Sequence, residues 1–486
     1  MFTDVTYQDW LAADDVAKAK LLKTIVDSYK ASAEFRRGVE AQQYFRGENP
    51  TVASKVILQE GRYKVEGTDE SGHRTTKYVE RKQAVVGARI SSSFLFRFVT
   101  QQNQFLLANG CQLESEETKA RLGYAFDTQL AQLGEQALLC GVAWGYWNLD
   151  HLEMISAAAD ANTGFVALLD EATSQPMVGV QFWQISPSRP LHVRLFELDG
   201  VSIWRKDEDD DVLKVIEPKR AYVVTINRDA AGESISTSSN YATLPVIPLY
   251  GNSERRSELT SAIKAKIDAY DNIASDFADN LDKANDVYWV LNNFGGNLAD
   301  MQDMIDTVRR TGILASISDG MSSSTAEPHA FKVPYEARQV ALALLEKSLY
   351  KDFMCINLDE ITGGGLTNVA IRMALSNLNL KVDRYEWQVR DFVQKLLELV
   401  GVRTEQINFK RSNIANDHET VDDIAAMLEY IDDRTALRLN PYIPDEDIDE
   451  ILDGLAARRM SGYSDAKQID QAIKQLDQEE TGSAPV

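Results

Sequence analysis

The sequence predicts a mixed α+β protein in which helical regions flank a β-rich middle segment. Three observations predict this class. Apolar residues recur every three or four positions over long stretches in both halves of the chain, as in amphipathic helices. Between residues 144 and 248, short β-branched and aromatic runs alternate with turn residues, as in an antiparallel sheet. Further on, two long helical patterns bracket a short segment with strand patterns of its own.

The composition is that of a globular protein of two to four domains, with 486 residues, 44% of them hydrophobic and 26% charged. The net charge of −23 argues against a protein that wraps nucleic acid tightly, but not against one past which DNA slides. The three cysteines form no CxxC pair, which favours a reducing, cytoplasmic setting. The sequence shows no signal peptide and no apolar run near the ~18 residues of a membrane span.

The first 60 residues or so are predicted to be mainly helical, with a loop marked by Gly47 and Pro50 within them. A second helical stretch ends at Gly110, a plausible C-cap. Ser115 and Glu117 then mark the start of another helix. The β-rich segment follows and closes at about Tyr250.

A long helix from about Ser257 to Asn285 has an apolar stripe and an acidic side. The stripe keeps steps of four and three: Leu259, Ile263, Ile267, Tyr270, Ala274, Phe277, Leu281 and Ala284. At 100° per residue, five aspartates project to the other side: Asp268, Asp271, Asp279, Asp282 and Asp286. Acidic helix faces are usually only solvated, so the residues alone leave open whether this side has a role.

A small β-α-β-β segment follows that helix. Its strands are expected at residues 287–291, at residues 313–318, which begin with Ile313 and Leu314, and at residues 329–333 just before Pro334, with a helix from Asn297 to Gly312. Three further elements come next: a helix over Tyr335–Ile356, a glycine-rich acidic loop over Asn357–Asn368, and a helix over Val369–Val400. The polar residues at the C-terminus, about 25 of them, are expected to be mobile.

Catalytic and metal-binding motifs are absent from the sequence. The triple glycine Gly363–Gly365 lacks the Lys-Ser/Thr of a Walker A loop. The five histidines show no HExxH spacing, the acidic runs contain no DxDxDG loop, and no GxSxG is present. The sequence therefore predicts no enzymatic activity, no metal and no cofactor.

The order of these elements resembles the portal proteins of tailed bacteriophages, also called head–tail connectors. Four stretches carry the resemblance: YFRGENP, LPVIPLYGN, AIKAKIDAYDNIASDFADNLD and DDRTALRLNPYIPDEDIDEI. The resemblance covers most of the chain. One departure lies at Leu366–Val369, where the glycine loop of the family often carries a Ser-Gly pair.

This resemblance implies a portal-like mixed α+β fold with a helical and β-rich wing, long stem helices, a small α/β clip and a helical crown. The implied divisions are a wing at 1–252, a stem helix at 253–285, a clip at 286–333, a second stem helix at 334–356, a tunnel loop at 357–368, an inner wing helix and strand at 369–412, a crown at 413–460 and a mobile tail at 461–486.

The resemblance also implies a structural ring, of twelve subunits in most portals, at the capsid vertex of a virion assembled in the host cytoplasm. Double-stranded DNA would pass through it during packaging and ejection, without sequence-specific contacts. The implied partners are the large terminase subunit, the major capsid and scaffold proteins and a head-completion adaptor, with no membrane. Two alternatives stay open: a nuclease or ATPase of the packaging machinery, and a coiled-coil interaction protein that forms no ring.

Three groups of residues take roles from this resemblance. The five aspartates of the stem helix would line the channel and repel DNA, which carries a phosphate charge about every 1.7 Å along its axis. The tunnel loop would contain Asp359, Glu360, Ile361, Thr362, Gly363, Gly364 and Gly365. Clip assembly and motor docking would involve Trp289, Met301, Met304, Ile313 and Leu314.

Overall fold

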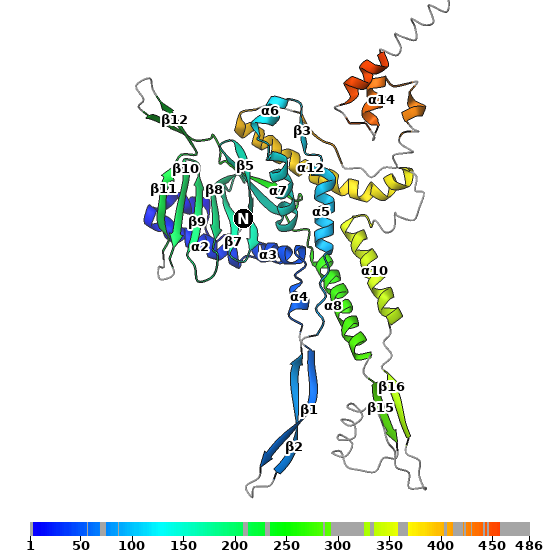
Figure 1. Cartoon of the computed structure of the whole chain (residues 1–486). Coiled ribbons are helices and arrows are strands. Elements are labelled where there is room, and N and C mark those ends of the chain that lie inside the picture. Colours follow the sequence, from blue (N-terminus) through cyan, green and yellow to red (C-terminus); the bar gives the residue numbers. More distant parts are fainter. Residues whose placement is uncertain are drawn as a thin grey trace, which may run out of the picture. The chain divides into compact units, whose positions relative to one another are not determined.

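The computed structural model confirms the mixed class of helices and strands (Figure 1). It describes residues 3–55, 57–68, 74–85, 87–207, 212–228, 234–284, 287–292, 325–330, 335–357, 368–402, 406–411 and most positions between 421 and 456. The chain forms two compact units. The first comprises Met1–Cys355 and Leu378–Ser412, and the second comprises Ile356–Asn377 and Asn413–Val486.

Four helices open the chain, as the apolar periodicity predicts: α1 (Tyr7–Ala12), α2 (Asp15–Ala31), α3 (Ala33–Phe45) and α4 (Pro50–Ala53). Each begins at a residue whose side chain accepts a hydrogen bond from the first helical turn: Thr6, Asp14, Ser32 and Asn49. The last of these caps precedes Pro50, which occupies the first turn of α4, where its missing N–H costs nothing.

A two-stranded hairpin follows, formed by β1 (Ile57–Thr68) and β2 (Arg74–Val85). The sequence predicts helix up to about residue 60, and this prediction is wrong from Ile57 onward, where β1 begins. The register places Glu60 opposite Lys82 and Arg62 opposite Glu80. These paired positions lie 22 and 18 residues apart in the sequence, so the periodicity of one short segment does not reveal the pairing of the two strands.

The β-rich segment is antiparallel, as predicted. One sheet has the order β11-β10-β9-β8-β7-β6 and another the order β14-β4-β5, while β12 and β13 form a separate hairpin. The strands are β4 (Val142–Asn148), β5 (His151–Ser156), β6 (Ala158–Asp160), β7 (Thr163–Leu169), β8 (Pro176–Trp183), β9 (Leu191–Glu197), β10 (Gly200–Lys206), β11 (Lys214–Arg220), β12 (Val223–Arg228), β13 (Ser234–Ser239) and β14 (Val246–Tyr250).

A buried core joins the six-stranded sheet to α2. Leu22, Ile25 and Val26 of α2 lie in the same buried cluster as Val180 and Val193 of the sheet. Three further helices complete this body: α5 (Phe94–Leu107), α6 (Glu116–Arg121) and α7 (Phe126–Cys140). The short strand β3 (Cys111–Leu113) lies between α5 and α6.

The helix start predicted at Ser115 is confirmed, because the Ser115 hydroxyl accepts a hydrogen bond from Thr118 N at 3.2 Å. We expect Ser115→Ala to lower the free energy of unfolding by about 1 kcal/mol, the usual cost of losing such a cap. Urea denaturation measures this loss. Ser238→Ala, at an exposed position of β13, is the control and should change the free energy of unfolding little. Equal effects of the two changes would contradict the capping role.

The two long helices predicted on either side of the small strand segment are confirmed as helices α8 (Ser261–Ala284) and α10 (Tyr335–Phe353), which pack against each other, and their role as a stem stays a prediction. The strand predicted at 287–291 is β15 (Val287–Asn292). It pairs antiparallel with β16 (Thr325–Ala330), which begins and ends earlier than the strand expected just before Pro334. The predicted helix from Asn297 and the predicted strand at Ile313 lie outside the described residues.

The third long helix is confirmed as α12 (Asn368–Val400), and β17 (Ile407–Phe409) pairs with β3. Helix α12 meets α7 at Gly134, where an added Cβ would lie 2.1 Å from the Tyr385 hydroxyl, so this contact requires glycine. In the second unit, α14 (Asp433–Leu439) is capped by Asp432. Among the described residues, no helix is long and apolar enough to cross a membrane.

Candidate functional site

The acidic side of α8 is bonded to the body of the first unit. Asp271 has no exposed surface and accepts hydrogen bonds from Asn49 Nδ2 at 2.7 Å and from the backbone N of Ser92 at 3.0 Å. Burial raises the pKa of the Asp271 carboxyl although these hydrogen bonds oppose the rise. The sequence predicts that Asp271 projects to the side opposite the apolar stripe, and in the structure the helix is packed against the body at Asp271 as well.

Asp268, one turn earlier, belongs to the same network. It accepts hydrogen bonds from the Tyr44 hydroxyl, from Asn49 Nδ2 at 3.1 Å and from Lys264 Nζ at 3.0 Å. Burial acts against the charged form, but these donors outweigh it and hold the pKa of Asp268 below its ordinary value. The Asn49 amide thus bridges two carboxylates, one partly exposed and one buried.

The segment 88–92 runs along the same helix and is attached at three points. The backbone N of Ala88 donates to Asp279 at 2.6 Å, the backbone N of Ile90 donates to the Ser275 hydroxyl at 3.0 Å, and that of Ser92 donates to Asp271. We call these five residues the strap. The strap is part of the segment that joins β2 to α5. Because side chains of α8 accept hydrogen bonds from its backbone N–H groups, this segment is held against the helix.

The apolar side of α8 packs as the sequence predicts. Leu259, Ile263 and Ile267 are buried. The stem helices also meet α5 through aromatic contacts: the Phe94 and Tyr270 rings lie 4.9 Å apart, and the Phe98 and Phe353 rings 4.6 Å apart. Together with the network above, these contacts hold α8 and α10 on the body.

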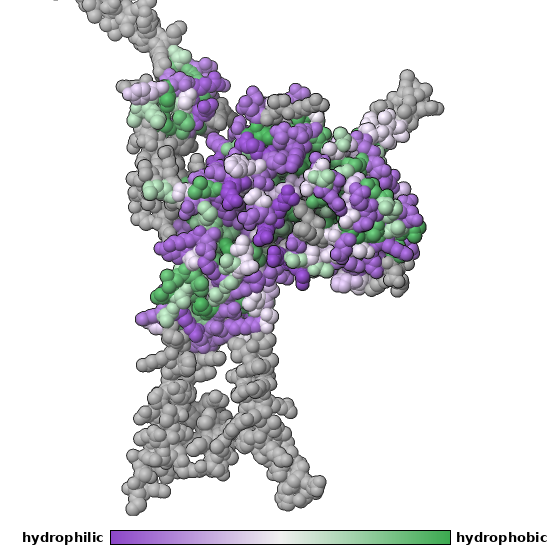
Figure 2. Space-filling model, turned by 180° about the vertical axis from the view of Figure 1, so that it is seen from behind, coloured by the Kyte–Doolittle hydropathy of each residue, from purple (hydrophilic) through white to green (hydrophobic). Residues whose placement is uncertain are grey.

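Helix α10 is apolar on a second side as well. Leu349 and Phe353 are buried at its C-terminal end, whereas Val340 is 58% exposed and Leu344 is 64% exposed. Tyr335 at its start is exposed too. Seen from behind, apolar side chains gather over this part of the helical region (Figure 2). A helix that is apolar on opposite sides is normally covered on both of them.

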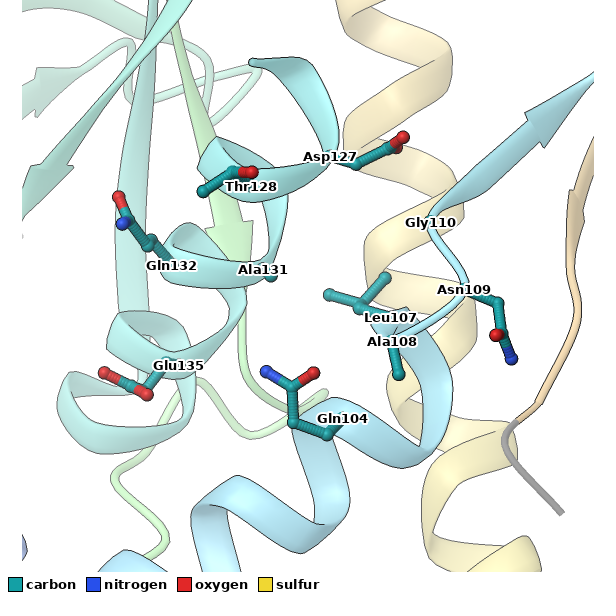
Figure 3. A pocket seen from close by; sticks show the side chains of 10 residues that line it. All are labelled: Gln104, Leu107, Ala108, Asn109, Gly110, Asp127, Thr128, Ala131, Gln132 and Glu135. Carbon is teal, nitrogen blue, oxygen red and sulfur yellow. The ribbon is translucent and has the colours of Figure 1, made fainter. Parts of the chain in front are cut away.

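A cavity of about 560 Å³ lies between α5 and α7 (Figure 3). Gln104 and Glu135 line it, and burial raises the pKa of the Glu135 carboxyl. At its edge, Asp127 forms an ion pair with Lys119 Nζ at 2.6 Å and accepts a hydrogen bond from the backbone N of Cys111 at 3.0 Å. Thr128 supplies the one hydroxyl among the lining residues, and no histidine, cysteine or lysine lines the cavity beside it.

Among the described residues, no group of three or more His, Cys, Asp or Glu side chains could hold a metal ion. The feature with the most specific geometry is therefore the stem junction: the Asp268–Asp271–Asn49 network, the strap and the exposed side of α10. These groups are arranged to hold helices and to present a surface.

Comparison with known proteins identifies the family. The family model described as phage portal protein, SPP1 Gp6-like, matches residues 31–461. The chain belongs to this portal family. The resemblance inferred from the sequence is thereby confirmed.

Two portal proteins illustrate the relationship. The portal protein of Clostridium phage phiCD119 is 25% identical over 428 residues, which cover 84% of this chain and 89% of that protein. The portal protein of Bacillus phage SPP1 is 26% identical over 219 residues, which cover 42% of each chain.

Not all residues predicted for portal function can be placed. Asp282 lies in the last turn of α8, and Trp289 lies in β15 opposite Pro328. The other predicted positions lie outside the described residues: Asp286, Met301, Met304, Ile313, Leu314 and the tunnel-loop residues 359–365.

Sequence reasoning missed the partners of the acidic side, which are Tyr44, Asn49 and the strap. For Asn49 a local signal exists, since asparagine before proline is typical of a helix start. That signal predicts the cap of α4, but it does not predict the contact with α8.

Proposed function

We propose that this portal chain assembles into a closed ring of about twelve subunits at the capsid vertex and that double-stranded DNA passes through the ring during packaging and ejection. The observation that carries the proposal is the family match over residues 31–461, because it spans nearly all the described elements. The subunit number follows the family resemblance alone.

The exposed side of α10 supports self-association. Fully burying one large aliphatic side chain is worth roughly 1.5–3 kcal/mol, so Val340 and Leu344 would each gain from a covering surface. The described part of the chain leaves this side open. In a ring, the stem helices of a neighbouring subunit would cover it.

An acidic channel wall is also part of the proposal, but it contains fewer residues than the sequence analysis assigned to it. Asp271 and Asp268 hold the stem to the body, so we do not assign them to the wall. The proposed repulsive residues are Asp279, Asp282 and Asp286 of the stem together with Asp359 and Glu360 of the tunnel loop. Asp279 already accepts a hydrogen bond from the strap and contributes less than the others. An acidic wall repels phosphates and lets the duplex slide.

The proposed partners bind outside the channel. The clip, with Trp289, Met301, Met304, Ile313 and Leu314, would pair with neighbouring subunits and meet the large terminase subunit. Its hairpin β15–β16 favours this, because a two-stranded sheet alone is marginally stable in water. The capsid and scaffold proteins and a head-completion adaptor are the other expected partners. The ring itself is proposed to be structural, with the packaging energy supplied by the terminase.

Assembly is the first test. A monomer has a mass of 54.4 kDa, and sedimentation at micromolar concentration and moderate salt should give a particle many times heavier, without disulfides. Low salt should weaken assembly, because like-charged subunits repel over a Debye length of ~10 Å at 0.1 M. A chain that stays monomeric under all these conditions would contradict the ring. Rings with a central hole in negative-stain images would distinguish it from other oligomers, and a nucleotide-hydrolysis assay with Mg²⁺ tests the enzyme alternative.

A further inference from the structure

A groove of about 960 Å³ lies beside the stem junction, within the first unit. Three segments form most of it: the residues that lead from β14 into α8, the C-terminal end of α10, and residues 380–387 of α12. Arg37 of α3 and Gln102 of α5 complete the lining. None of these residues belongs to the acidic network of α8. The groove is therefore separate from the hydrogen bonds that hold α8 on the body.

The charged groups on the floor of the groove neutralise each other. Lys381 forms an ion pair with Glu258 at 2.9 Å, and both side chains are mostly buried. The same ammonium group donates to the backbone O of Phe353 at 3.1 Å and lies 3.2 Å from the centre of the Phe353 ring. Because Lys381 and Glu258 neutralise each other, the charge that a ligand would meet comes from the side chains on the walls of the groove.

The walls carry unpaired positive charge. Arg37 and Arg256 are exposed and form no ion pair within the described part of the chain. Arg384 is exposed as well, and its guanidinium makes one long hydrogen bond, 3.4 Å, to the Ser253 hydroxyl.

The acidic groups beside these arginines are mostly occupied. Asp352 is bound to Lys266 and Asp383 to Arg411, which leaves Glu254 as the unpaired carboxylate among the described lining residues. The mouth of the groove is thus basic, in a chain whose net charge is −23.

Two large apolar side chains lie at the same mouth. Trp387 is 69% exposed and Leu380 is 60% exposed, and their spacing of seven residues puts them on one side of α12. Tryptophan and arginine are the residue types most enriched among the energetically dominant residues of protein interfaces. An exposed tryptophan beside unpaired arginines is therefore typical of a docking surface.

We infer that this groove receives an acidic segment with an apolar side chain from a second copy of this chain. Two observations favour a second copy. The unpaired arginines are complementary to an acidic surface, and a second copy of this chain offers such a surface because its net charge is −23. The end of α10 also lines the groove, and the same helix carries the exposed Val340 and Leu344 on another side, so a second copy that covers this helix would lie close to the groove. The inference rests on the proposed ring and assigns one of its subunit contacts.

The test compares the assembly of purified full-length variants by sedimentation over a protein concentration series. Trp387→Ala should raise the concentration needed for half-assembly roughly thirtyfold, which corresponds to the ~2 kcal/mol that defines an interface hot spot. Arg37→Glu combined with Arg256→Glu should weaken assembly most at low salt. Tyr124→Ala, a fully exposed aromatic position outside the groove, is the matched control and should assemble like the wild type.

The outcomes separate this inference from the proposed function. A wild type that never assembles contradicts the ring itself. If the wild type assembles and both the Trp387→Ala and the arginine variants assemble at the same protein concentrations, the groove assignment is wrong but the ring stands. Arginine variants that assemble normally but lose affinity for duplex DNA would also overturn it, because the groove would then bind nucleic acid. As a direct readout, tryptophan emission should shift to the blue on assembly in the wild type, and this shift should be reduced in Trp387→Phe.

Discussion

Replacing Asn49 with aspartate is expected to cost about 3–5 kcal/mol of the free energy of unfolding at pH 7. The new side chain has the same shape and can still cap α4, so the helix start is kept. The donor that bridges Asp268 and Asp271 is lost, and a third carboxylate takes its place. One buried and one partly buried carboxylate would then face a like charge, in a place where water does not replace the missing donor.

The pH dependence has a defined sign. In the wild type, the raised pKa of Asp271 means that its contribution to stability is present below the ordinary value of 3.8 and is lost as pH rises through the folded pKa. The lowered pKa of Asp268 has the opposite effect, and its contribution is lost as pH falls through the folded pKa. A third carboxylate raises the pKa of all three groups, so the defect of Asn49→Asp should shrink as pH falls toward about 4.5.

Urea denaturation at both pH values measures this effect, and Asn109→Asp is the matched control. Asn109 is exposed, and its side-chain amide donates a hydrogen bond to the backbone O of Lys410 at 2.8 Å rather than to a carboxylate. Its replacement should cost no more than about 1 kcal/mol. If the two variants lost the same stability, or if the loss in Asn49→Asp grew at low pH, Asn49 would not be the bridge between the two aspartates.

The fold was predictable from the sequence where the signal is local and periodic. The stem helices and α12 lie within a few residues of their predicted bounds, because long apolar stripes identify them and Gly401 ends the last of them. The start of α6 was predictable because Ser115 caps it through an adjacent turn. The hairpin β1–β2 was not predictable, because its pairing joins residues far apart in the sequence, such as Ile57 with Val85, and a local pattern does not contain that pairing.

The candidate site shows the same limit more sharply. Helical geometry gathers the aspartates of α8 on one side, and this much follows from spacing. Whether that side meets solvent depends on Asn49 and Ser92, which lie 222 and 179 positions away from Asp271 in the sequence. A periodicity argument cannot see contacts over such separations. Consequently the aspartates that look equivalent in the sequence divide into anchors and proposed wall residues.

Reversing the proposed wall charges should make the ring hold DNA. The variant carries Asp282→Lys, Asp359→Lys and Glu360→Lys, and it leaves the anchors Asp268 and Asp271 unchanged so that the stem junction is preserved. In a ring, each subunit would contribute three positive charges. Each phosphate neutralised releases counterions, so the slope of log affinity against log salt should steepen by about 0.9 per contact. At low salt the affinity of the ring for duplex DNA should therefore rise at least tenfold.

Two measurements check this result: the affinity of assembled rings for duplex DNA across a salt series, and the length of DNA packaged in vitro. The matched control reverses three exposed acids outside the stem, Asp4→Lys, Glu171→Lys and Glu217→Lys, and changes the net charge by the same amount. Long-range attraction alone would raise the affinity of both variants equally. If the wall is as proposed, only the stem and loop variant binds more tightly, and it packages shorter DNA because the retained duplex resists the motor. A variant that assembles, binds like its control and packages full-length DNA would show that these carboxylates are only solvated.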